Sequence, residues 1–224
     1  MNREAVLAED TKKRICSAAA GLFFENGYEK TTLRMIAAKV GMTHVGVLKY
    51  FSSKLELASH AFISYVTGLI ELRERMAQSL PFPEADADYY HQLLWWSLHF
   101  KLLSENQPFR RFYISYLKEL PSINANPLLA APPSTTQNLR ITRPENNTLV
   151  SQSMVIAADA MLASLIDHGL VDCVLATKLM LRNAWLYGLS PDFDPSEQEV
   201  ASFIEAYIAG VEVDILHDFL LADA

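Results

Sequence analysis

Cysteine is scarce in this 224-residue chain, since Cys16 and Cys173 are the only two and lie far apart in the sequence. This excludes a framework of disulfide bridges and the clustered cysteine spacing of a structural zinc site. Long apolar runs are also lacking, because no stretch reaches the roughly 18 apolar residues that a membrane-spanning helix needs. The N-terminus contains no apolar segment typical of a signal peptide. We therefore expect a soluble, cytoplasmic protein.

Hydrophobic residues make up 50% of the chain, which is enough to bury the core of one or two domains. The formal net charge is −7, but it is unevenly distributed. Residues 1–56 hold nine Lys/Arg against six Asp/Glu, a net +3, and the remaining residues hold 10 against 20, a net −10. A basic N-terminal part on an acidic body favours contact with a polyanion through the first part only.

Apolar residues recur at helical spacing along almost the whole chain, and little alternates with period two, so the sequence predicts an all-α protein. Residues 121–147 are rich in Pro, Asn, Ser and Thr and predict a long loop, whose order the sequence leaves open. The predicted helices cover residues 10–26, 33–40, 44–50, 53–80, 89–104, 108–120, 149–168, 171–187 and 196–221.

The spacing of two short predicted helices around Gly41 is that of a helix-turn-helix. Thr32 and Thr43 stand at their N-cap positions, and Gly41 suits the tight bend between them. Such a pair needs a small core of its own. We expect Ile36, Val47 and Leu48 to form that core, and Ala37 and Ala38 to let the two helices lie close together.

The second helix of such a pair would enter the major groove of DNA. We expect His44 to hydrogen-bond a base and Val45 to touch a thymine methyl group, while Gly46 lets the backbone approach. Helix N-termini and cationic side chains would bind phosphates. The residues predicted to contact DNA are Thr32, Arg34, Thr43, His44, Val45, Gly46, Lys49, Tyr50 and Lys54.

The run ICSAAAGLFFENGYEKTTLRMIAAKVGMTHVGVLKYFSSKLEL resembles the N-terminal domain of the TetR family of bacterial transcriptional regulators. The shared features are A-x-x-L-F-x-x-x-G-Y at 19–28, T-T at 31–32, I-A at 36–37 and F-x-S-K at 51–54. The resemblance implies a three-helix DNA-binding domain, residues 1–54, and a helical effector-binding and dimerisation domain, residues 55–224. It also implies a cofactor-free, non-enzymatic homodimer that binds a palindromic operator, most simply as a repressor.

Two positions depart from the family pattern. Leu48 stands where the family usually has a tyrosine that contacts phosphate, and His44 stands where a lysine is frequent. Tyr50, two positions after Leu48, could supply the missing contact, and the sequence leaves this open. Because histidine titrates near neutral pH, base reading by His44 would depend mildly on pH.

Aromatic residues in the body predict a cavity for a small apolar or aromatic effector, with His99 as its polar anchor. Packing as ordinary core is the alternative. The residues predicted to line the cavity are Phe62, Tyr65, Leu69, Trp95, Trp96, His99, Phe112, Tyr113, Tyr116 and Trp185.

The last two predicted helices carry apolar residues at helical spacing. We expect the body of a single chain of this size to be too small to bury all of them. We expect them to form a four-helix bundle with a second copy of the chain, with core packing inside one chain as the alternative. The residues concerned are Leu175, Leu179, Arg182, Leu186, Phe203, Tyr207, Val211 and Ile215.

Two other classes of protein are alternatives to a regulator. Asp88-x-x-His91 and Asp214-x-x-His217 are similar to the carboxylate-histidine pairs of di-iron helical bundles, which would make the chain an oxidative enzyme. An adaptor that has lost DNA binding is the third reading, which Leu48 keeps open. No catalytic triad, phosphate-binding loop or zinc spacing is present, so we expect no enzyme and no metal. The sequence names neither the effector, the operator nor the sign of regulation.

Overall fold

The computed structural model describes residues 3–83, 86–120, 148–182 and 194–220, and all regular elements within these ranges are helical, as the sequence predicts. The predicted loop at 121–147 and Trp185 and Leu186 lie outside the described residues. No helix in the described ranges has the length and apolar content to span a bilayer. The elements are α1 (Arg3–Asn26), α2 (Leu33–Lys39), α3 (His44–Leu48), α4 (Lys54–Ser79), α5 (Ala87–Glu105), α6 (Gln107–Glu119), α9 (Thr148–Asp167), α10 (Cys173–Arg182), α11 (Glu197–Phe203) and two π-helical segments, η4 (Ile204–Ile208) and η5 (Ile215–Leu220).

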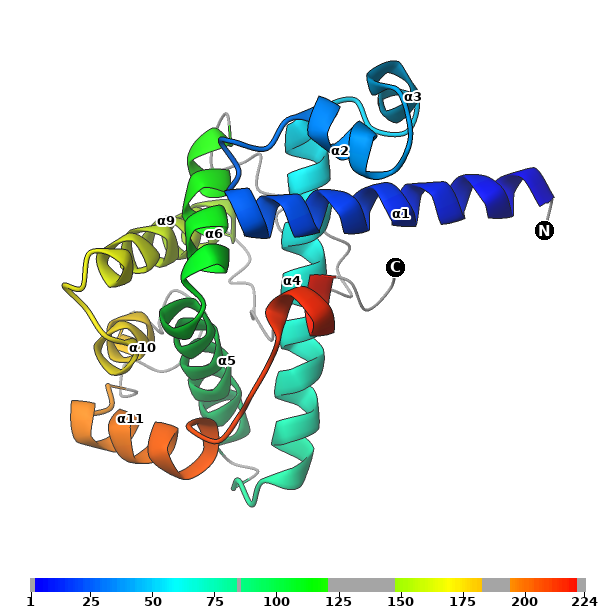
Figure 1. Ribbon diagram of the computed structural model, residues 1–224. Coiled ribbons are helices and arrows are strands. Elements are labelled where there is room, and N and C mark those ends of the chain that lie inside the picture. The colour runs from blue at the N-terminus through cyan, green and yellow to red at the C-terminus, as the bar shows by residue number, and fades with distance from the viewer. Residues whose placement is uncertain (1–2, 84–85, 121–147, 183–193, 221–224) are drawn as a thin grey trace.

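Helices α1, α2 and α3 form a head at one end of the molecule, where α1 crosses α4 and its first turns project outward (Figure 1). α1 begins at Arg3, so the predicted start at Asp10 is wrong. Residues 3–9, REAVLAE, are mostly strong helix formers and extend the helix. Thr11 lies inside this helix and donates a hydrogen bond from Oγ1 to the carbonyl of Leu7 at 2.8 Å. α1 stops before Gly27, whose φ of 80° favours glycine.

Helix α4 joins the head to the body. Ser53 is its N-cap, with Oγ accepting a hydrogen bond from the amide of Glu56 at 3.1 Å. α4 packs along α5, the buried central helix, in which residues 91–103 are all buried. Phe62, Tyr65 and Leu69 of α4 are each at most 1% exposed, as their helical spacing predicts. α6, α9 and α10 complete the body around α5.

The predicted single helix at 196–221 is wrong. α11 and η4 end at Ile208, the chain turns at residues 209–210, and η5 then packs on α4 and α1. Ile215 is fully buried there, and the amine of Lys101 donates a hydrogen bond to the carbonyl of Val211 at 2.8 Å. Burial of η5 and this long-range bond therefore favour the break over a continuous helix.

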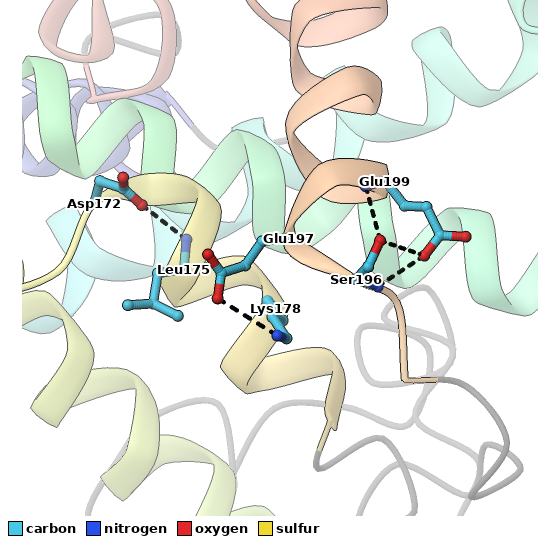
Figure 2. Close-up of polar contacts among 6 residues, drawn as sticks. All are labelled: Asp172, Leu175, Lys178, Ser196, Glu197 and Glu199. Atoms are coloured by element: carbon cyan, nitrogen blue, oxygen red, sulfur yellow. Dashed lines mark hydrogen bonds and ion pairs between the residues drawn. The ribbon is translucent and has the colours of Figure 1, made fainter.

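Figure 2 shows the polar contacts where α10 and α11 meet. The Lys178 amine pairs with the Glu197 carboxylate at 3.5 Å across the two helices. Ser196 and Glu199 form a reciprocal capping box that starts α11. Because Glu199 accepts hydrogen bonds from the Ser196 backbone and side chain, its pKa is lowered.

Candidate nucleic-acid interface and buried polar network

The turn between α2 and α3 has the local geometry that its sequence predicts. The Oγ1 atoms of Thr32 and Thr43 accept hydrogen bonds from the amides of Met35 at 3.2 Å and Gly46 at 3.0 Å. Gly41 adopts a φ of 71°, and its amide bonds the carbonyl of Ala38 at 3.2 Å. The next amide, of Met42, bonds the carbonyl of Ala37 at 2.8 Å, which completes a Schellman ending of α2.

The core of the head differs in part from the predicted one. Ile36, Ala37 and Val47 are buried and Ala38 is exposed, but Leu48 is 38% exposed, so the prediction that Leu48 belongs to the core is wrong. In a five-residue helix whose buried side is occupied by Val47, the next residue turns about 100° away from that side. Leu48 therefore lies on the outer side of α3. Val45, three residues earlier and 65% exposed, lies on the same side.

Most of the residues predicted to contact DNA are accessible on the head. Thr32, Arg34, Thr43, Val45 and Lys49 are exposed, and His44 and Gly46 are partly exposed. Both threonine hydroxyls accept backbone hydrogen bonds yet keep their own hydrogen for an external oxygen. An arrangement of exposed cations beside two capped helix N-termini can hold phosphates while α3 lies against base edges.

Tyr50 and Lys54, also predicted to contact DNA, have internal contacts. Tyr50 is half-buried and packs against the hydrophobic core. The Lys54 amine donates a hydrogen bond to the carbonyl of Tyr28 at 3.0 Å and lies 4.0 Å from the centroid of the Tyr28 ring. Their phosphate contacts stay predictions, and substituting Lys54 would also remove a bond that supports the head.

A buried polar network connects four helices of the body. The Tyr65 hydroxyl on α4 lies 2.8 Å from Nδ1 of His99 on α5, whose Nε2 lies 2.9 Å from the carboxylate of Asp159 on α9. The Tyr113 hydroxyl on α6 donates to the other Asp159 oxygen at 2.5 Å. Burial first, and then the charge of Asp159, raise the pKa of Tyr65 and Tyr113 well above the usual value, so both phenols stay protonated donors. A hydrogen on Nε2 of His99, with Nδ1 accepting from Tyr65, satisfies every hydrogen bond in this network.

Asp159 is the member of this network that sequence reasoning missed. The available signal was a lone carboxylate inside the apolar helical stretch MVIAADAML. Aspartate is rarely buried without a partner, so its position on an inward face of α9 indicates a polar partner in the core.

The predicted cavity residues lie together, packed as core. Phe62, Tyr65, Leu69, Trp95, Trp96, His99, Phe112, Tyr113 and Tyr116 are all buried, and Trp185 lies outside the described residues. The rings of Phe62 and Tyr116 are 5.1 Å apart, and those of Phe112 and Phe23 are 5.5 Å apart. The second contact continues the aromatic cluster from the body into α1 of the head.

The two Asp-x-x-His pairs lie in different surroundings. Asp88 is exposed at the start of α5 and His91 is buried, whereas Asp214 and His217 are both exposed near η5. Within the described part of the chain, no group of three His, Cys, Asp or Glu side chains could hold a metal ion.

The structure buries some residues of the predicted dimer surface and leaves others accessible. Phe203 is 7% exposed and Ile215 is fully buried, so the prediction that one body cannot cover them is wrong. Tyr207 remains 38% exposed, and Leu175 and Leu179 of α10 are half-buried.

An all-α head with two capped short helices, a glycine turn and an outward-facing second helix defines a helix-turn-helix DNA-binding protein. Residues 15–61 match the family model described as bacterial regulatory proteins of the tetR family. Residues 15–61 therefore form a DNA-binding domain of the TetR type, as the sequence motifs predict.

Among solved structures, the chain is similar to the TetR family transcriptional regulator PfmR from Thermus thermophilus. The two share 20% sequence identity, with a TM-score of 0.37, over 89% of this chain and 96% of that one. The comparison with curated proteins gives no match.

Proposed function

We propose that the chain is an effector-responsive repressor that binds a palindromic operator as a homodimer and leaves it when a small apolar or aromatic ligand binds. The observation that supports this most directly is the head, in which α3 turns an exposed side outward between two capped helix N-termini. The net charges of +3 in residues 1–56 and −10 in the remainder favour approach to DNA through this head.

The contacts divide by chemistry. Thr32, Arg34, Thr43 and Lys49 would hold phosphates and fix the register of the head, because hydroxyls and cations at helix N-termini suit phosphate oxygens. His44, Val45 and Gly46 would lie closest to base edges. In this proposal the protein acts in the cytoplasm, and the head binds DNA without a cofactor.

The effector would bind around the network of Tyr65, His99, Tyr113 and Asp159. The hydrogen bonds of this network lie among aromatic rings. The polar group of a ligand with an apolar body could replace one of these bonds, and the remaining polar groups would orient the ligand. The surrounding Phe62, Leu69, Trp95, Trp96, Phe112, Tyr116 and Trp185 would supply the apolar contacts. α4 carries Tyr65 and begins at Lys54 in the head, so it would transmit the change.

The homodimer would form through α10 and α11, whose mutual orientation the Lys178–Glu197 pair supports. Of the residues predicted for this surface, Arg182 and Tyr207 are exposed and Leu175 and Val211 are half-buried, so they could take part in such contact. A twofold pair must place its two recognition helices about 34–36 Å apart to reach successive major grooves.

The test is selection of bound duplexes from a random pool, followed by affinity measurements at several salt concentrations. If each dimer neutralises about six phosphates, the slope of log affinity against log salt should be near −5. Arg34→Ala and Lys49→Ala should weaken all duplexes alike, whereas Arg111→Ala, at an exposed position of α6 in the body, should not. Failure of the wild-type protein to select any duplex would refute DNA binding, and a monomer in light scattering would refute the dimer.

A further inference from the structure

The C-terminal part of the chain returns from the body to the head. We define residues 211–220 as the C-terminal strap, which runs from the end of η4 to α4 (Figure 1). At its start, the Lys101 amine donates to the carbonyl of Val211 at 2.8 Å and also pairs with Glu105 at 2.6 Å. At its end, Phe219 and Leu220 are buried. The strap is thus anchored to α5 at one end and to α4 and α1 at the other.

Phe219 is seated directly on Gly68, in the middle of α4. A Cβ atom at Gly68 would overlap Cδ1 of Phe219 and lie 3.0 Å from its Cβ, so any larger residue there must displace the whole Phe219 side chain. Glycine is less favourable than alanine inside a helix, and Gly68 does not have a positive φ that would require it. The seat for Phe219 is therefore the structural reason for glycine at this position.

The strap also reaches the head on both sides of η5. Leu216 borders a surface cavity of about 430 Å³ together with Gly21 of α1 and with Lys39 and Val40 at the end of α2. Leu220 borders a second cavity of about 260 Å³ whose lining includes Tyr50 and Phe51, shortly after α3. Across these two cavities the strap therefore faces the end of α2 and the segment after α3, and it packs directly on α4 and α1.

We propose that the C-terminal strap is a clamp that fixes the orientation of the DNA-binding head on the body. This inference rests on the proposed DNA binding. With Phe219 on Gly68, η5 holds α1 against α4, and Lys101 ties the same segment to the body, so the head cannot turn independently. Release of the strap removes this constraint and lowers operator affinity, because the two heads of a dimer must then be ordered again on binding.

The perturbation that releases the strap with the least other change is Gly68→Ala. Alanine favours the helical conformation of α4, so the effect arises at the Phe219 seat and not from loss of helix. The matched control is Gly210→Ala, next to the strap, where an added Cβ has no atom within 4 Å. Both variants are compared with wild type on the duplex that the wild-type protein selects, and hydrogen exchange of residues 215–220 reports the state of the strap.

Gly68→Ala should speed exchange in residues 215–220 and lower affinity for the selected duplex by at least about 5-fold, a coupling typical of regulatory conformational changes. Gly210→Ala should change neither. Phe219→Ala removes the clashing ring, so adding Gly68→Ala to it should cause no further loss. If Gly68→Ala speeds exchange but leaves affinity unchanged, the strap does not fix the orientation of the head. If Gly68→Ala leaves exchange unchanged, Phe219 is not held in place by Gly68. Absence of any selected duplex for wild type is a separate outcome, which would overturn the proposed function itself.

Discussion

The outer side of α3 is apolar, with Val45 65% exposed and Leu48 38% exposed. Among groups in the major groove, the thymine C5-methyl is the one that such side chains recognise. We predict that replacing a contacted thymine by deoxyuridine, which removes only this methyl group, weakens binding. Burial of one methyl-sized group is worth about 0.8 kcal/mol, so the loss is about 4-fold for one half-site and about 15-fold when both half-sites are changed.

The assay is fluorescence anisotropy at one fixed salt concentration, with the selected duplex and single thymine-to-deoxyuridine versions of it. Leu48→Ala and Val45→Ala each complete a double-mutant cycle with the altered base. If the methyl group is read by one of these side chains, that variant should lose affinity for the thymine duplex and be insensitive to deoxyuridine. Equal losses on both duplexes, or no effect of deoxyuridine at any position, would refute methyl reading by α3.

Three further predictions concern the parts of the fold that support the two sites. Asp159→Ala should destabilise the protein in urea unfolding by roughly 1–3 kcal/mol for each partner left unsatisfied in the core, whereas Tyr113→Phe should cost less because the carboxylate keeps the His99 bond. Thr43→Ala removes the cap on the Gly46 amide and should cost about 1 kcal/mol in the same assay, and an unchanged midpoint would contradict the capping role. Burial raises the pKa of the Cys16 thiol from 9.0 to about 11. Because only the thiolate reacts, alkylation of the folded protein at pH 8 should be about 100-fold slower than that of the urea-unfolded chain and should speed up with rising pH, and equal rates would contradict this burial.

The elements fixed by local chemistry were predictable from the sequence. Thr32, Gly41 and Thr43 define α2 and α3 through bonds that span only a few residues, and those bonds are present in the structure. The TetR motifs at residues 19–54 lie inside the segment that the family model matches. Local signals of this kind do not depend on the rest of the chain.

Features that depend on distant contacts were not predictable. Helical periodicity continues through residues 209–214, and the break there reflects a bond from Lys101 to Val211 and a seat at Gly68, both remote in sequence. The exposed position of Leu48 follows from the burial of the neighbouring Val47 on α3, which residue type alone does not indicate. The partners of Asp159 come from two other helices, so only the fold could identify them.

Tyr65 is the residue at which the proposed effector site and the C-terminal strap meet. Its hydroxyl bonds His99 at 2.8 Å, and its ring centroid lies 6.0 Å from that of Phe219. A ligand that takes the place of the hydroxyl bond would therefore act on the residue that supports the strap. The hydroxyl of Tyr65 bonds His99, whereas its ring supports Phe219. Tyr65→Phe distinguishes these two roles, because it removes the hydroxyl and keeps the ring.

We predict that Tyr65→Phe leaves hydrogen exchange of residues 215–220 and ligand-free operator affinity close to wild type, because the ring still supports Phe219. The response to an effector found by a thermal-shift screen should weaken, since the bond between α4 and His99 is gone. Its loss should cost about 1 kcal/mol of stability, which urea unfolding would measure. Operator affinity that falls without ligand, together with an unchanged response to effector, would place the coupling between body and head outside Tyr65.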